Sequence, residues 1–209
     1  MKQQFDIYLA SASPRRRELL DQLGVRYHVI RQDVAEDVQA GESPQAYVQR
    51  LALEKAWAGW NSLPAGNRIP VLGADTAVVI DGRILGKPRD RDEGLAMLAQ
   101  LSGRCHEVYS AVAIVAETEA VKVNCSRVCF DTLDTGLRKA YWDSGECRDK
   151  AGAYAIQGRA AAFITKLDGS YSGVMGLPLF ETAGLLKQFG IDPLRLPQVA
   201  EVREDRKII

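Results

Sequence analysis

Histidine is scarce in this sequence, and its cysteines are not arranged in closely spaced pairs. His28 and His106 are the only two histidines, and neither lies near a nucleophile-elbow motif, which disfavours a serine or cysteine nucleophile. The cysteines form no CxxC pair, so a zinc site and a disulfide framework are both disfavoured. Because Cys125 and Cys129 lie in an alternating apolar stretch, we expect reduced cysteines that are buried or half-buried. The full set is Cys105, Cys125, Cys129 and Cys147.

Long apolar runs and an excess of one charge are also missing. No stretch approaches the roughly 20 apolar residues that span a bilayer, and the N-terminus MKQQFDIYLAS lacks the features of a signal peptide. We therefore expect a cytoplasmic protein with no membrane segment. The 27 basic residues balance 27 acidic ones, which argues against a nucleic-acid polymer as partner, because such binders usually have a strongly basic face. A small polyanion remains compatible with this balance.

The composition favours one folded domain. With 46% hydrophobic residues among 209, the chain is neither disordered nor too small to build a core. A chain of this size buries roughly 70% of its unfolded surface. We expect a single domain over residues 1–209, arranged as two lobes around a cleft, with a charged and frayed tail at 197–209.

The hydrophobic pattern predicts a mixed α/β fold, in which a mixed β-sheet is flanked by helices. Ser-Pro pairs at 13–14 and 43–44 and a capping box at Asp90 and Glu93 mark three helix starts. The first strand is followed by SASPRRRELL, which lacks the GxGxxG fingerprint of a dinucleotide-binding domain. Predicted strands cover 5–10, 27–30, 71–80, 83–85, 108–115 and 121–130, with a hairpin at 162–171; predicted helices cover 14–23, 44–60, 90–101, 134–143 and 178–189.

The junction after the first strand combines hydroxyl groups with positive charge. A helix N-terminus offers free N–H groups and the positive end of the helix dipole, so these side chains would form a phosphate cradle. The alternative is a solvated basic turn whose arginines pair with Glu18 or Asp21. The residues concerned are Ser11, Ser13, Arg15, Arg16 and Arg17.

The hairpin around Asp81 and Gly82 supplies a second candidate group. Asp75 lies in an otherwise apolar strand, where it could hold Mg²⁺ or accept a proton from water. If the strands pair regularly on both sides of this turn, Thr76 lies opposite Lys87, and Asp75 points to the other face of the sheet. A bulge at Gly86 would change the direction of the lysine side chain. The alternatives are a turn residue for Asp75 and an ordinary edge-strand residue for Lys87.

A third candidate group is the glycine-punctuated stretch 152–158. Its small residues would let the backbone approach a flat ligand, and Gln157 offers both a donor and an acceptor to a base edge. The alternative is a tight turn between strand segments.

Five separated segments together resemble the Maf family of nucleoside triphosphate pyrophosphatases. They run in the family's order from about Tyr8 to Thr182: LASASPRRRELL, LGADTAVVIDGRILGKPRD, LSGRCHEVYSAVAI, DKAGAYAIQG and SYSGVMGLPLFET. The resemblance implies a usually dimeric, metal-dependent enzyme that cleaves a triphosphate between the α and β phosphates. It also implies an elongated mixed sheet around a cleft, similar to that of inosine triphosphate pyrophosphatases. The GADT form with IQG resembles the branch that prefers dTTP and UTP.

The resemblance also assigns roles to single residues. It implies that Asp75 is the proton acceptor, and that Glu36, in a loosely matching segment, is a metal-associated carboxylate. Ala12 stands where glycine is common, and Arg17 is an additional arginine. The base-specificity positions fall on Arg15, Thr76 and Gln157. The phosphate-side positions fall on Ser11, Arg15, Arg16, Lys55 and Lys87.

These expectations combine into one mechanistic hypothesis. The chain would hydrolyse dTTP and UTP, and related non-standard pyrimidine triphosphates, to the monophosphate and pyrophosphate. Fixed cations would stabilise the charge that develops on the leaving group. Mg²⁺ or Mn²⁺ would bind through Asp75 and Glu36, and at this stage Asp75 could be the base, a metal ligand or both. The alternative function is a non-catalytic nucleotide-binding regulator linked to septum formation, and in either case we expect a homodimer.

Overall fold

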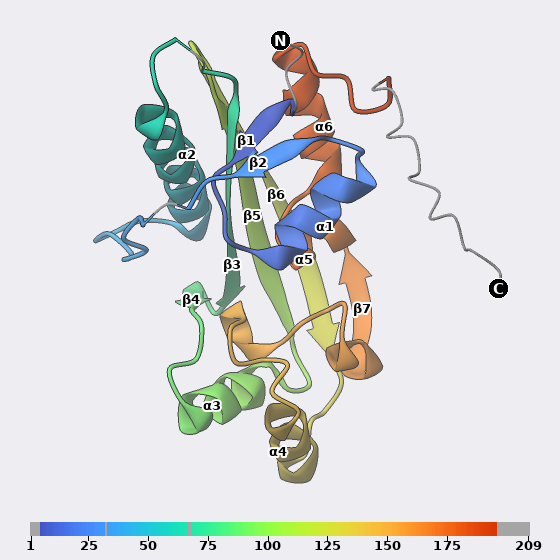
Figure 1. Cartoon of the computed structure of the whole chain (residues 1–209). Coiled ribbons are helices and arrows are strands. Elements are labelled where there is room, and N and C mark those ends of the chain that lie inside the picture. Colours follow the sequence, from blue (N-terminus) through green and yellow to red (C-terminus); the bar gives the residue numbers. More distant parts are fainter. Residues whose placement is uncertain (1–4, 32, 67, 196–209) are drawn as a thin grey trace, which may run out of the picture.

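The fold is a seven-stranded mixed β-sheet flanked by helices, as expected (Figure 1). The computed structural model describes residues 5–31, 33–66 and 68–195, so the expected tail at 197–209 lies outside the described residues. The strand order is β2-β1-β3-β5-β6-β7, and β4 also pairs with β3. Strand β1 runs parallel to β2 and β3, and the other pairings are antiparallel. The strands are β1 Ile7–Leu9, β2 Tyr27–Val29, β3 Val71–Ile80, β4 Arg83–Leu85, β5 Cys105–Val115, β6 Glu119–Phe130 and β7 Ile164–Asp168.

The predicted helix starts are confirmed. Ser43 accepts a hydrogen bond from the Ala46 N–H at 3.2 Å, and Asp90 accepts one from the Glu93 N–H at 2.9 Å. Ser13 precedes the first helix, but its side chain makes no capping hydrogen bond. The helices are α1 Pro14–Gln22, α2 Pro44–Ser62, α3 Arg91–Leu101, α4 Thr135–Asp143, α5 Tyr171–Met175 and α6 Leu179–Gln188, with 3₁₀ turns at Ala151–Ala153 and Arg159–Phe163.

The two faces of the sheet are covered by different helices. Helix α2 packs on one face, while α1, α5 and α6 lie on the other, and α3 and α4 lie near one end of the sheet (Figure 1). Along β3, Ala77 and Val79 belong to the core beneath α2, whereas Val78 and Ile80 belong to the core on the opposite face. The absence of a side chain at Gly73 lets α2 approach, since a Cβ there would lie 2.3 Å from the Ala52 carbonyl oxygen.

The predicted hairpin at 162–171 is wrong. Only β7 is a strand in this region, and it pairs with β6. The chain then turns at Gly169, whose φ is +125°, and enters α5. Ser170 causes this change, because its hydroxyl accepts a hydrogen bond from the Gly173 N–H at 2.9 Å and so caps a helix.

The expectation of four reduced cysteines is also wrong. Cys105 and Cys129 form a disulfide, because the antiparallel register of β5 and β6 places them directly opposite one another. A long-range strand pairing of this kind leaves no mark in local cysteine spacing. Cys125 and Cys147 are free. Cys147 is buried as expected, but Cys125 is exposed, so the expectation that it would be buried or half-buried is wrong.

The described helices give no sign of a membrane segment. Within residues 5–31, 33–66 and 68–195, no helix has the length and apolar character needed to cross a bilayer.

Candidate active site

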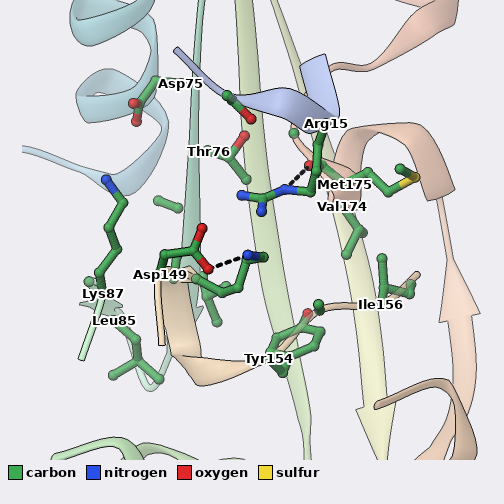
Figure 2. A pocket seen from close by; sticks show the side chains of 18 of the residues that line it. Arg15, Asp75, Thr76, Leu85, Lys87, Asp149, Tyr154, Ile156, Val174 and Met175 are labelled. Carbon is green, nitrogen blue, oxygen red and sulfur yellow. Dashed lines mark hydrogen bonds and ion pairs between the residues drawn. The ribbon is translucent and has the colours of Figure 1, made fainter. Parts of the chain in front are cut away.

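A gap along one edge of β3 creates the candidate site. At one end of this edge, β1 pairs with Val71 and Leu72, and at the other end β4 pairs with 78–80. Between them, residues 73–77 have no strand partner on this edge within the described part of the chain. Because neighbouring side chains on a strand point to opposite faces, Asp75 projects toward α2 and Thr76 toward α5. Both line one pocket that opens through the gap, and Figure 2 shows them on opposite sides of β3.

Four charged side chains form what we call the charged end of the pocket: Glu36, Lys55, Asp75 and Lys87. The Lys55 Nζ lies between the two carboxylates, 2.7 Å from Asp75 Oδ1 and 2.6 Å from Glu36 Oε1. The Lys87 Nζ lies 3.6 Å from Glu36 Oε2. Lys55 is a half-buried residue of α2, whereas Lys87 is exposed.

Burial and charge act in opposite directions on the two carboxylates. Asp75 is only 6% exposed, and this burial raises its pKa even though Lys55 and Arg16 favour the ionised form. Partial burial also pushes the pKa of Glu36 upward, but the hydrogen bond and charge of Lys55 outweigh it, so the Glu36 pKa is lowered. Asp75 is therefore the stronger base of the two.

Lys87 reaches this end because the chain leaves the sheet early. The predicted turn is confirmed, since Ile80 pairs with Arg83. Pairing stops at Leu85, however, and the Gly86 carbonyl instead accepts a hydrogen bond from the Gly152 N–H at 3.0 Å. The expected pairing of Thr76 with Lys87 is therefore wrong.

The inference that Lys87 and Asp75 face different sides is overturned with that pairing. Figure 2 shows both on the α2 side of the pocket. Lys87 lies beyond the end of β4, so its side chain does not have to follow the alternation of faces that holds within a strand. The gap beside β3 therefore lets it lie on the same side as Asp75.

The arginines at the start of α1 face the same pocket. The Arg16 Nε donates to the Gly176 carbonyl at 2.8 Å, and its Nη1 donates to Ser11 Oγ at 3.1 Å. The Arg15 Nε donates to the Met175 carbonyl at 3.2 Å. Burial lowers the pKa of Arg16, and the charge of Asp75 opposes that shift.

These contacts contradict the solvated-turn alternative for Arg15 and Arg16, while the phosphate cradle stays a prediction. Arg15 and Arg16 line the pocket rather than forming a solvated turn. Arg17 is exposed and does not line it. Ser11 does not line the pocket either, but its hydroxyl holds Arg16 in place.

The pocket is also lined by uncharged side chains, which we call the neutral end: Thr76, Tyr154, Ile156 and Gln157. Gln157 is exposed, while Tyr154 and Ile156 are buried. The glycines of the 152–158 stretch allow close packing, but 3₁₀ turns rather than strand segments flank the stretch, so the alternative of a turn between strand segments is wrong. A Cβ on Gly152 would lie 2.9 Å from Val78 Cγ1, and the φ of Gly152 is +67°.

Sequence reasoning assigns no role to several pocket residues. The Tyr47 hydroxyl donates to the Glu36 backbone carbonyl at 2.9 Å, and burial raises the pKa of Tyr47 to about 12. In the sequence, Tyr47 belongs to the apolar face of a helix. Asp149 and Lys150 form an ion pair and line the pocket. They begin the segment DKAGAYAIQG, which could have pointed to them.

The charged end has the chemistry of a site for a hard cation. No group of three or more histidines, cysteines or carboxylates gathers within the described residues. Two carboxylates do converge, and the Lys55 ammonium lies between them. Oxygen ligands from one or two carboxylates, completed by water and substrate phosphates, suit Mg²⁺ and Mn²⁺. The donor set therefore fits the expected metal.

Comparison with known proteins identifies the family. Residues 6–189 match the family model described as Maf, Maf-like protein. This chain belongs to the Maf family. A relative from Alkalilimnicola ehrlichii, called dTTP/UTP pyrophosphatase, is 55% identical over 189 residues, covering 89% of this chain and 94% of the relative. Two more Maf relatives carry the same name. The relative from Saccharophagus degradans is 50% identical, and the match covers 89% of this chain and 90% of the relative. The relative from Xanthomonas axonopodis is 53% identical, and the match covers 88% of this chain and 98% of the relative.

A solved structure lies much further away. The nucleoside-triphosphatase or dITP/XTP pyrophosphatase of Mycobacterium abscessus aligns with 61% of this chain and 75% of its own, at 20% identity and a TM-score of 0.38. That likeness is too low to add to the argument. The fold class of this Maf member rests on its own sheet and helices.

The expected site residues come together, although their roles remain predictions. Of the residues to which the family resemblance assigns a role, all except Ser11 line this pocket: Arg15, Arg16, Glu36, Lys55, Asp75, Thr76, Lys87 and Gln157. They derive from distant parts of the chain, on α1, α2, β3 and the loops around them.

Proposed function

We propose that this chain hydrolyses dTTP and UTP to the nucleoside monophosphate and pyrophosphate. The observation that carries the proposal is the pocket itself, in which lysines and arginines surround the buried carboxylate of Asp75. The names of the Maf relatives support the choice of substrate. Related non-standard pyrimidine triphosphates belong to the same proposed substrate class.

The chain's own groups perform the reaction through charge and proton transfer. Arg15, Arg16 and Lys87 supply positive charge for a triphosphate that carries about four negative charges near neutral pH. Asp75 accepts a proton from water, and the water oxygen forms a bond to the α-phosphorus. The anhydride bond breaks, and its electron pair leaves with pyrophosphate. The raised pKa of Asp75 supports this assignment, because a stronger base accepts that proton more readily.

Mg²⁺ or Mn²⁺ is part of the proposal. Asp75 and Glu36 would hold the ion, in the region where the Lys55 ammonium now bridges them. When bound, the metal would neutralise phosphate charge and lower the pKa of coordinated water. Tyr47 supports this arrangement by holding the backbone of Glu36.

The homodimer and the cytoplasmic location belong to the proposal as well. Both rest on the family resemblance and the sequence. Light scattering on the purified chain tests the first, with twice the 23.0 kDa chain mass as the expected result.

The test is a triphosphate panel with Mg²⁺ or Mn²⁺, in which the products are identified as well as counted. We expect UTP and dTTP to yield monophosphate and pyrophosphate. Release of orthophosphate and diphosphate would overturn the proposal. Tight nucleotide binding without metal-dependent turnover would instead favour the regulator function.

A further inference from the structure

A chain of hydrogen bonds lies beneath the neutral end. Thr76 of β3 pairs with Ser110 of β5 in the antiparallel register, and their hydroxyl oxygens are 2.9 Å apart. The Ser110 hydroxyl also lies 2.6 Å from the backbone carbonyl of Gly173 in α5. Ser110 is completely buried, whereas Thr76 lines the pocket.

Counting protons fixes the direction of this chain. A serine hydroxyl has one proton, and a carbonyl oxygen can only accept. The Ser110 proton is therefore donated to the Gly173 carbonyl. Ser110 can only accept from Thr76, so the Thr76 proton points away from the pocket. What Thr76 presents to a ligand is a lone pair.

We propose that Ser110 is a positioning residue that makes Thr76 an obligatory hydrogen-bond acceptor, and that this acceptor selects uracil and thymine over cytosine. The inference rests on the proposed function. Uracil and thymine carry an N–H at ring position N3, whereas cytosine carries a lone pair there. Thr76 matches the first and repels the second.

The neighbouring groups make this contact decisive. Gln157 offers both a donor and an acceptor, so it can adapt to either kind of base. The Thr76 hydroxyl cannot adapt while it donates its proton to Ser110. Tyr154 and Ile156, which line the same pocket, are buried, and an unpaired acceptor is costly in an apolar pocket. A site built around one fixed hydrogen bond rejects the analogue that cannot make it.

The test is Ser110→Ala, with kcat/KM measured for UTP and CTP. The native chain should prefer UTP. In the variant the Thr76 hydroxyl is free to rotate and can donate to N3 of cytosine. We expect kcat/KM for CTP to rise and the UTP/CTP ratio to fall about tenfold or more. An unchanged ratio would overturn the inference, as would equal use of UTP and CTP by the native chain.

Ser126→Ala is the matched control. Ser126 is a buried serine on β6, 1% exposed, and its hydroxyl accepts from the Ser170 N–H at 2.8 Å just before α5. It therefore supports the same part of the chain without touching Thr76. We expect its UTP/CTP ratio to stay native. Equal falls in both variants would mean a general loosening of α5 and would contradict the proposal.

A second pair of variants covers the case in which Ser110→Ala does not fold. Thr76→Ser retains the hydroxyl and should retain the UTP/CTP ratio. Thr76→Val removes the acceptor and should collapse the ratio toward one. If both variants keep the native ratio, the inference fails.

Product analysis of the native chain separates the two claims. If UTP gives no monophosphate and pyrophosphate, the proposed function fails. If it does and the ratios do not respond, only the role of Ser110 fails.

Discussion

The charged end and the neutral end of the pocket are built from adjacent residues of one strand. Asp75 projects toward α2 and is bonded to Lys55, whereas Thr76 projects toward α5 and is bonded to Ser110. In a continuous sheet these side chains would lie on opposite faces and serve separate surfaces. The gap between β1 and β4 opens both faces into one pocket. A one-residue step along β3 thus separates the proposed phosphate chemistry from the proposed base recognition.

The variant with the largest expected effect on this comparison is Asp75→Asn. We expect turnover to fall roughly 1,000-fold, because the carboxylate that accepts the proton is lost. The fold should survive, because the raised pKa of Asp75 shows that its ionised form is disfavoured in the folded state. Steady-state kinetics and a thermal melt check both parts. Near-native activity would remove Asp75 from the chemistry.

The two lysines of the charged end should differ in effect. Lys55 is 12% exposed in its side chain and touches both carboxylates, while the Lys87 side chain is 62% exposed. Solvent screens the second charge more strongly. We expect Lys55→Met to lower kcat/KM about 100-fold and Lys87→Met only about tenfold. The UTP/CTP ratio should stay native in both variants, and a larger loss from Lys87→Met would contradict the comparison.

Acid should weaken the support of the neutral end through His106. The His106 side chain is buried, and its Nε2 lies 2.9 Å from the Tyr154 hydroxyl oxygen. Burial lowers the pKa of His106 from 6.5 to about 4. The folded state therefore favours neutral His106. The contribution of neutral His106 to the free energy of unfolding is complete above pH 6.5 and is lost as the pH falls toward about 4. The loss amounts to at most about 3 kcal/mol.

Chemical denaturation at pH 7.5 and pH 4.5 checks this effect, with His106→Gln as the variant. Glutamine cannot titrate in this range, so the variant should lose less stability on acidification than the native chain. An equal loss in both proteins would show that other groups dominate.

The smallest expected effect is that of Tyr47→Phe. The variant loses one hydrogen bond to the Glu36 carbonyl, worth about 1 kcal/mol. The metal concentration for half-maximal rate should rise a few-fold, while the rate at saturating metal and the UTP/CTP ratio stay native. A shift in base selectivity would contradict the separation of the two ends.

Local signals predict much of the fold. The Ser-Pro pairs before α1 and α2, Asp90 before α3 and the Asp-Gly turn after β3 each act through contacts with near neighbours. Such signals are readable because the interaction and the residue lie in the same segment. Local patterns also single out Arg15, Asp75 and Lys87 as candidates, whereas the roles of Glu36 and Lys55 come from the family resemblance.

Long-range contacts explain what the sequence does not reveal. The Cys105–Cys129 disulfide and the Thr76–Ser110 hydrogen bond both depend on which residues face each other across β5. The joint location of Asp75 and Lys87 depends on where β4 stops. Each follows from strand register, which is set by the whole sheet and not by a local pattern.

The most direct measurement is a phosphorus NMR time course on UTP, with Mg²⁺, for the native chain and Asp75→Asn side by side. The native chain should convert UTP to UMP and pyrophosphate, and Asp75→Asn should leave UTP intact on the same time scale. Formation of UDP and orthophosphate by the native chain, or unchanged turnover in the variant, would contradict the assignment of chemistry to the charged end.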